Sequence, residues 1–449
     1  MSHSLDLTSG SIWRKLVRYS APLVVSNLLQ TMYNIADMIV AGHFIGTASI
    51  SAISNATSVM NMITLIIIGL TTGGNILIGQ HFGAKNKKGC QESTTTLLSS
   101  AMIMGVVVAA AIYFTSRHIL IALKAPALDD AAQYLKICSI GIIFISGYNA
   151  ANAMLRAVGN SRAPLICITI SSCMNVILDI IFVVVFRWGI AGTAIATILT
   201  QLISFAVAIV IVLQNYEVFG VKLSRLYIKK QSLNKMLALG IPCAVQNSIA
   251  SISWLSVAYL VNSHGLIISS GNGISNRIKD FCHLFISAMM ASSTSMVAQN
   301  LGAEKYDRAR KVIYTAVKIT LCMSAALIVI VEIAAPLFVG FFTPDKDTAA
   351  AAILNLRVEI FSQLFYAVIL IGHAFMIGAG DTWYAFVSSF INCILFRIPL
   401  AFILNHLFGI LGVYLACMIA PCTSIPFAIW YDRSNRWRRS LVRDRQKIT

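Results

Sequence analysis

The chain has 449 residues, of which 57% are hydrophobic and 11% are charged, and its mean hydropathy is +0.78. A soluble domain cannot carry so much apolar surface, so the composition excludes a soluble globular protein and indicates a polytopic membrane protein. The net charge of +17 would suit nucleic-acid binding, but the basic residues are distributed as membrane topology requires. We therefore expect a lipid bilayer and no nucleic acid as a partner.

The chain carries no pattern of a disulfide scaffold, a metal site or an enzyme. Its ten cysteines occur singly, mostly within apolar runs, and its eight histidines form no metal-spaced cluster. No nucleophile motif occurs, so we expect no enzyme activity and no cofactor. The first twenty residues lack the apolar core and cleavage site of a secretory signal peptide, so the first helix is expected to remain in the membrane.

Twelve apolar runs have the length of about 20 residues that a helix needs to cross a bilayer. Their centres lie near residues 30, 64, 103, 143, 174, 202, 249, 285, 323, 366, 394 and 420. With a cytoplasmic N-terminus, most of the 34 basic residues fall in cytoplasmic segments, and the outer segments hold Arg117, Lys124, Arg187 and Lys346. The positive-inside rule therefore predicts that both termini lie in the cytoplasm and that the chain lies in the cell membrane.

An internal repeat organises the chain into two halves. Landmarks recur about 220 residues apart at Pro22 and Pro242, in GQHFGA and AQNLGA, at Gly159-Asn160-Ser161 and Gly380-Asp381-Thr382, and at Gly189–Gly192 and Gly409–Gly412. Because six helices per half is an even number, both halves enter the membrane from the same side. We therefore expect an all-α polytopic membrane protein with twelve transmembrane helices in two six-helix lobes, related by a pseudo-two-fold axis along the membrane normal.

The repeat predicts the domain boundaries. The N-terminal lobe is expected at 1–213, a cytoplasmic linker at 214–234 and the C-terminal lobe at 235–431. A basic cytoplasmic tail follows at 432–449, and its composition is typical of a solvated end that faces lipid. Parallel repeats of this kind occur in secondary transporters that bind substrate between two lobes, although a repeat can also persist for packing reasons alone.

Two carboxylates lie inside apolar runs of the N-terminal lobe at comparable depth. Asp37 lies about 28 Å above the cytoplasmic end of the first helix and Asp179 about 22 Å above that of the fifth, at 1.5 Å per residue. An acid at membrane depth is expensive and is by default a functional-site hypothesis. Four helices contribute polar residues at this level, namely Gln30, Asp37, Tyr134, Asn175, Asp179 and Thr197.

Carboxylate, amide, phenol and hydroxyl oxygens are hard ligands that suit Na⁺, and paired carboxylates also suit proton capture. We therefore predict a cation-coupling site in the N-terminal lobe, with Na⁺ binding at Asp37, Asn175 and Asp179 as one form of it. The alternative is a buried polar network that holds the lobe together. Pro22 lacks a backbone N–H, which leaves the first helix easier to bend.

The C-terminal lobe does not repeat these acids. In the repeat, Asp37 corresponds to Val257 and Asp179 to Arg397. Arg397 could line a central cavity with Tyr366 and Asp280 and contact an anionic substrate, or it could pair with a backbone carbonyl or a nearby acid. Local ion pairing or a position at a helix end would account for the remaining acids, which are Asp280, Glu332 and Glu359.

Several motifs together resemble the MATE (multidrug and toxic compound extrusion) family of secondary transporters. They are APLVVSNLLQTMYNIADMIVAGHFIG, GQHFGA, AQNLGA, LRAVGNSRAP, and NVILD followed by GIAGTAIAT. The N-lobe polar set looks most like that of the DinF-like branch. NorM-like members place cation-binding acids on helices seven and ten, where this chain has approximately Ala250 and Tyr366.

The resemblance implies a monomeric antiporter that exports small amphipathic or cationic drugs or metabolites. Inward flow of H⁺ or Na⁺ would drive the export, with alternating access between the two lobes. The alternative is a flippase for lipid-linked precursors, which would require a strongly cationic central cavity. Of the basic residues in the membrane, Arg277, Lys279, Arg357 and Arg397 could contribute to one.

Overall fold

The computed structural model describes residues 6–44, 47–122, 128–222 and 226–442, with the backbone alone for 34–44 and 47–52. In these ranges all regular structure is helical, and eleven segments are long and apolar enough to cross a membrane. The additional helix α1 (Ile12–Phe44) has 33 residues and continues through Pro22. The prediction of an all-α polytopic membrane protein is confirmed.

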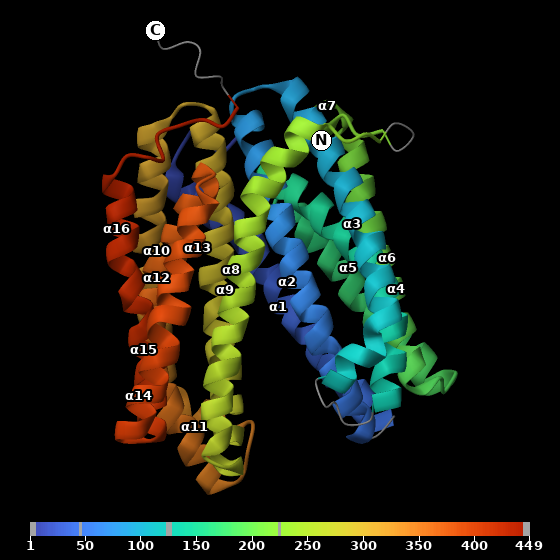
Figure 1. Cartoon of the computed structure of the whole chain (residues 1–449), viewed down its shortest axis with the longest axis vertical. Coiled ribbons are helices and arrows are strands. Elements are labelled where there is room, and N and C mark those ends of the chain that lie inside the picture. Colours follow the sequence, from blue (N-terminus) through green and yellow to red (C-terminus); the bar gives the residue numbers. More distant parts are fainter. Residues whose placement is uncertain (1–5, 45–46, 123–127, 223–225, 443–449) are drawn as a thin grey trace. The chain divides into compact units, whose positions relative to one another are not determined.

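The helices fall into two units, and within each unit long helices run alongside one another (Figure 1). After α1 come α2 (Thr47–Gly83), α3 (Lys87–Ala122), α4 (Leu128–Ala157), α5 (Arg162–Asp179), η1 (Ile180–Val185), α6 (Gly189–Gln214), α7 (Tyr216–Phe219) and α8 (Lys230–Ser263). The later elements are α9 (Leu266–Gly302), α10 (Tyr306–Gly340), α11 (Lys346–Glu359), α12 (Ser362–Ala379), α13 (Thr382–Phe390), η3 (Ile391–Arg397), α14 (Ile398–Phe408), α15 (Ile410–Ile419), η4 (Ala420–Ser424) and α16 (Ile425–Arg433).

The division between the units falls inside two helices. The first unit contains Ala21–Ala244, and the second contains Leu7–Ser20 and the chain from Val245 onward. The chain therefore crosses between units within α1 and within α8, and the expected linker at 214–234 lies inside the first unit. The repeat-related prolines Pro22 and Pro242 each lie close to one of these crossings.

The N-terminal segment belongs to the second unit because polar side chains of the AQNLGA motif bind its backbone. The side chain of Gln299 accepts a hydrogen bond from the N–H of Leu7 at 3.1 Å, and the amide of Asn300 donates to the Leu7 carbonyl at 3.2 Å. Lys305 donates to the carbonyl of Thr8 at 2.9 Å. Leu7 itself is fully buried, so both its apolar side chain and its backbone polar groups are satisfied there.

The first half of α8 packs tightly against α2 within the first unit. The α2 sequence GLTTG, from Gly69 to Gly73, faces the small residues Gly240 and Ala244 of α8. A Cβ on Gly73 would lie 2.2 Å from the carbonyl oxygen of Met236, and one on Gly69 would lie 2.4 Å from the Cα of Ala244. Small residues spaced four apart allow such backbone contact between membrane helices, where apolar lipid supplies no hydrophobic drive for association.

The prediction of a solvated tail was wrong for Trp437, which packs into the second unit, whereas Arg436, Arg438 and Arg439 are exposed. Trp437 is fully buried, its ring nitrogen donates to the carbonyl of Asp432 at 3.0 Å, and its ring lies 4.9 Å from that of Phe375. Asp381, from the GDT landmark, accepts from Tyr431 at 2.6 Å and forms an ion pair with Arg439. Basic composition alone did not reveal Phe375 and Asp381 as partners, because both come from a distant part of the sequence.

The α2–α8 contact predicts that Gly73→Ala destabilises the protein by about 1–3 kcal/mol, because the added methyl group forces the two backbones apart. The apparent unfolding temperature of the purified chain in detergent would measure the effect. Gly273→Ala on α9 is the matched control, since a Cβ there meets nothing within 4 Å. Equal unfolding temperatures of the Gly73→Ala and Gly273→Ala variants would contradict close packing at Gly73.

The docked tail predicts that Trp437→Ala costs about 3–5 kcal/mol, the usual cost of emptying a buried aromatic site. The same thermal measurement applies, with limited proteolysis of the tail as a second readout. Trp13→Ala is the control, because Trp13 is 55% exposed. A tail that is cleaved equally fast in wild type and in Trp437→Ala would show that Trp437 does not hold it.

Candidate functional site

Asp179 and Asn175 form the buried polar centre of the first unit. Both lie on α5 four residues apart, which places them on one face of the helix, and they are 0% and 1% exposed. Asp179 is the last residue of α5, and the chain then changes to the π-helix η1. Such π-helical turns often occur at functional sites, because they alter the direction of side chains without ending the helix.

Asn175 carries an oxygen that is available to a ligand. Its Oδ1 atom is buried and has no hydrogen-bond partner among the described residues. An unsatisfied buried acceptor is unfavourable by about 1–3 kcal/mol, so such an oxygen has a reason to bind a cation or a proton donor. Asn175 and Asp179 lie four residues apart on α5, which puts an amide and a carboxylate on the same side of this helix.

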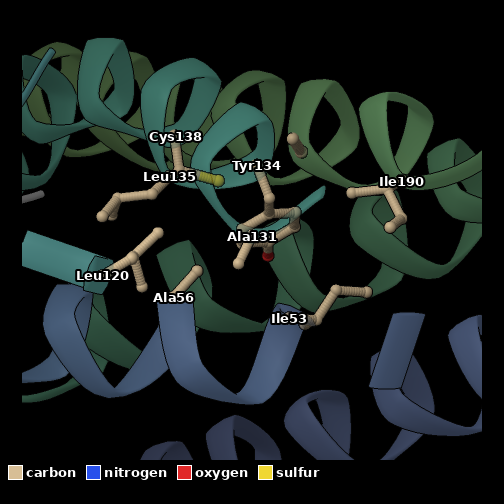
Figure 2. Close-up of a cluster of buried hydrophobic side chains, with 9 residues drawn as sticks. Ile53, Ala56, Leu120, Ala131, Tyr134, Leu135, Cys138 and Ile190 are labelled. Atoms are coloured by element: carbon tan, nitrogen blue, oxygen red, sulfur yellow. The ribbon is translucent and has the colours of Figure 1, made fainter. Parts of the chain in front are cut away.

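Tyr134 lies in a mainly apolar setting between four helices of the first unit. It is 3% exposed and packs with Ile53 of α2, Leu120 of α3 and Ile190 of α6, as Figure 2 shows. Its own helix, α4, adds Ala131, Leu135 and Cys138 to the same cluster. The ring therefore contributes to the core that fixes α4 against α6, whatever its hydroxyl contacts.

The other residues predicted for the N-terminal site differ in exposure. Gln30 is exposed, and Thr197 is half-buried on α6 with its hydroxyl donating to the carbonyl of Thr193 at 2.9 Å. That bond uses the hydroxyl proton and leaves the oxygen able to accept. Pro22 is half-buried, and its carbonyl accepts from the hydroxyl of Ser26 at 2.8 Å. The backbone of Asp37 belongs to α1, and its side chain lies outside the described residues.

The second unit contains a cavity of about 350 Å³ that gathers all three residues predicted for the C-terminal lobe, Arg397, Tyr366 and Asp280. Its polar lining also includes Gln246, Asn247, Asn276, Lys279, His283, Ser287, Glu359, Ser362, Gln363, His373, Ser389 and Asn392. Ala250 lies in the same wall, so both positions at which NorM-like proteins are expected to place acids line this cavity.

A buried ion pair forms one side of the cavity. Lys279 of α9 pairs with Glu359 at the end of α11, and both side chains are less than a tenth exposed. Asn355 connects them, because its Oδ1 accepts from Lys279 at 3.1 Å and its amide donates to Glu359 at 3.2 Å. Pairing of Glu359 with its sequence neighbour Arg357 is thereby excluded, and Arg357 lies 3.7 Å from Glu332 instead. The expectation of local pairing was wrong for Glu359 because the partner comes from another helix.

Arg397 forms another part of the wall and is 1% exposed. Its Nη2 atom donates to the hydroxyl of Tyr366 at 2.5 Å, and its guanidinium lies over the ring of Trp254 at 4.7 Å. The Nε and Nη1 atoms have no hydrogen-bond partner in the described part of the chain. Arg397 ends the π-helix η3, so in both units a charged residue adjoins a π-helical turn.

A buried polar cluster around His373, which sequence reasoning missed, forms another part of the cavity wall. His373 of α12 lies 3.2 Å from the amide of Gln246 and 3.0 Å from the hydroxyl of Ser388, and Gln246 also donates to Ser389 at 2.8 Å. A histidine within an apolar run was the available signal. No three His, Cys, Asp or Glu side chains among the residues described are arranged to hold a metal ion.

Comparison with known proteins places the chain in a family. The MatE family model matches residues 22–181 and again residues 242–403, which confirms the internal repeat. The probable multidrug resistance protein YoeA of Bacillus subtilis is 26% identical over 92% of both chains. The multidrug export protein MepA of Staphylococcus saprophyticus is 22% identical over 98% of this chain and 96% of its own.

Solved structures agree on the fold. One described as the outward-facing conformation of a multidrug resistance MATE family transporter of the MOP superfamily superposes with a TM-score of 0.90. It is 21% identical and covers 97% of this chain and 98% of its own. The resemblance read from the motifs is confirmed: the chain belongs to the MATE family, whose members are membrane transporters and not enzymes.

Proposed function

We propose that this protein is a secondary antiporter that exports small amphipathic or cationic molecules, driven by inward flow of H⁺ or Na⁺. The observation that carries the proposal is the buried Asn175–Asp179 face on α5, at membrane depth in a protein of this family. Relatives named as multidrug export proteins support export as the direction of transport. The polar set resembles that of the DinF-like branch, which supports coupling through the first unit.

Cation binding at this face would lower the free energy of the first unit, because it would compensate the buried carboxylate of Asp179. A carboxylate in low-dielectric surroundings is unfavourable unless a cation or proton compensates it. The free oxygen of Asn175 supplies a neutral ligand beside Asp179, and we assign the second carboxylate to Asp37. Coupling follows if the cation and the exported molecule favour different conformations of the protein, since equal affinity for both states would shift nothing.

The helix α1 is the element through which that energy acts on the rest of the protein. It contains Pro22, whose missing N–H leaves one backbone carbonyl without its helical partner. Bending at this position costs less than elsewhere in the helix. Because α1 belongs to the second unit before Ala21 and to the first unit after it, a bend at Pro22 changes the connection between the units.

The cavity of the second unit argues against the flippase alternative. A flippase would need several uncompensated cations, but Lys279 pairs with Glu359 and Arg357 faces Glu332. These acids offset the positive charge of Lys279 and Arg357, which a flippase would need in order to bind a pyrophosphate. We further propose that the protein works as a monomer in the cell membrane with both termini in the cytoplasm, on the distribution of its basic residues.

We expect Asp37→Asn to abolish ion-driven export, because an amide at this position can neither release a proton nor compensate Na⁺. Substrate efflux would be measured in oriented vesicles with a pH gradient and a Na⁺ gradient imposed separately, and the variant should fall to the rate of empty vesicles. Asp129→Asn is the control, since Asp129 is exposed and pairs at the surface with Arg117. Wild-type efflux by a correctly folded Asp37→Asn protein would refute the coupling role.

We expect Asn175→Ala to raise the ion concentration for half-maximal efflux about tenfold, equivalent to the loss of about 1.4 kcal/mol of cation binding. The fold should persist, because the Oδ1 atom that is removed has no partner in the described structure. Asn149→Ala serves as the matched control in the same unit, since its amide donates to the carbonyl of Ile145 within its own helix. If Asn175→Ala did not change the ion concentration for half-maximal efflux, the amide of Asn175 would not take part in cation binding.

A further inference from the structure

Arg397 is a buried cation whose hydrogen-bond donors are only partly satisfied by the described residues around it. A guanidinium is always charged, and burying it away from water is costly unless its donors are satisfied. Arg397 is 1% exposed, yet its Nε and Nη1 atoms lack a hydrogen-bond partner among the described residues. Tyr366, the partner of Nη2, is a neutral hydroxyl. The cavity thus contains buried donors on a cation without a bound counter-charge.

The acids in the cavity wall do not neutralise Arg397. Glu359 accepts from Lys279 with one oxygen and from the amide of Asn355 with the other, and no ion pair within 4 Å joins it to Arg397 in the described residues. Asp280 lines the cavity but remains exposed, and no ion pair joins it to Arg397 within 4 Å in the described structure. The arginine is therefore the group in this wall that calls for a negatively charged ligand.

The surroundings of Arg397 favour an aromatic anion of modest size. One face of its guanidinium is covered by the ring of Trp254, and its Nε and Nη1 atoms on the edge have no hydrogen-bond partner in the described structure. Tyr366 and His283 stand edge to face at 5.5 Å in the same wall, and the small side chain of Ala250 also lines the cavity. The volume of about 350 Å³ lies in the range of small-molecule sites, about 300–1,000 Å³.

We propose that the cavity of the second unit binds the carboxylate of small aromatic acids through Arg397, with Trp254 and Tyr366 holding the guanidinium in place. Charge-assisted hydrogen bonds from arginine to carboxylate are short and strong, especially away from water. This inference rests on the proposed export function in one respect, since it assigns to the exporter a class of molecules that carry a carboxylate. It also assigns the two units opposite preferences, cations in the first and organic anions in the second.

Binding of 4-fluorobenzoate to the purified full-length chain, followed by fluorine NMR in detergent, tests the proposal. We expect saturable binding to wild type and at least a tenfold weaker affinity for Arg397→Gln. The neutral isostere 4-fluorobenzamide should not compete. Arg357→Gln is the matched control, because this arginine is half-exposed and lies against Glu332, so its loss should leave binding unchanged.

Two further variants separate binding from folding. Arg397→Lys keeps the charge and should bind with reduced affinity, and Ala250→Phe should block the cavity without touching the arginine. Unchanged binding in Arg397→Gln, equal binding of the benzamide, or displacement of the probe by millimolar chloride or phosphate would each overturn the proposal. The assay needs no gradient, so failure of ion-driven export in vesicles and failure of this binding are distinguishable.

Discussion

The cost of placing polar groups in hydrocarbon is the constraint on which the rest of this structure depends. It requires every backbone N–H and C=O group to be satisfied within its own segment, and this accounts for the uniformly helical chain. It also makes each buried charge an exception that needs a reason. Lys279 and Glu359 are buried together because each neutralises the charge of the other. Asp179 and Arg397 are buried charges of another kind, since each adjoins a π-helical turn.

The repeat makes this contrast informative. Two halves of common origin keep their landmarks in register, and the family model matches both of them. Against that shared background, the buried charged residue that adjoins a π-helical turn is an aspartate, Asp179, in the first unit and an arginine, Arg397, in the second. A scaffold function would favour keeping the same packing in both halves. Opposite charges beside the two π-helical turns indicate that the two units present different chemistry at these buried positions.

Much of the fold was predictable because its signals are local. Twelve apolar runs follow from composition along the chain, and the spacing of Asn175 and Asp179 places them on one face of a helix without any knowledge of tertiary structure. The pairing of Lys279 with Glu359 was not predictable in this way, since the partners are 80 positions apart and the nearer Arg357 offered a local alternative. The burial of Trp437 was not predicted for the same reason, because its aromatic partner is distant in the sequence. Its burial depends on Phe375 and on the position of α12, while the local sequence is strongly basic.

The helices α1 and α8 each pass from one unit into the other. Residues 7–20 are held in the second unit by Gln299 and Asn300, while the same helix continues into the first unit after Ser20. The helix α8 repeats the arrangement in reverse, with its first half fixed to α2 through Gly73 and its second half in the other unit. In each connection a close contact holds the part of the chain before the crossing, at Leu7 for α1 and at Gly73 for α8. Pro22 and Pro242 lie close to the two crossings, and because each proline lacks a backbone N–H, bending the helix there costs less than elsewhere along it.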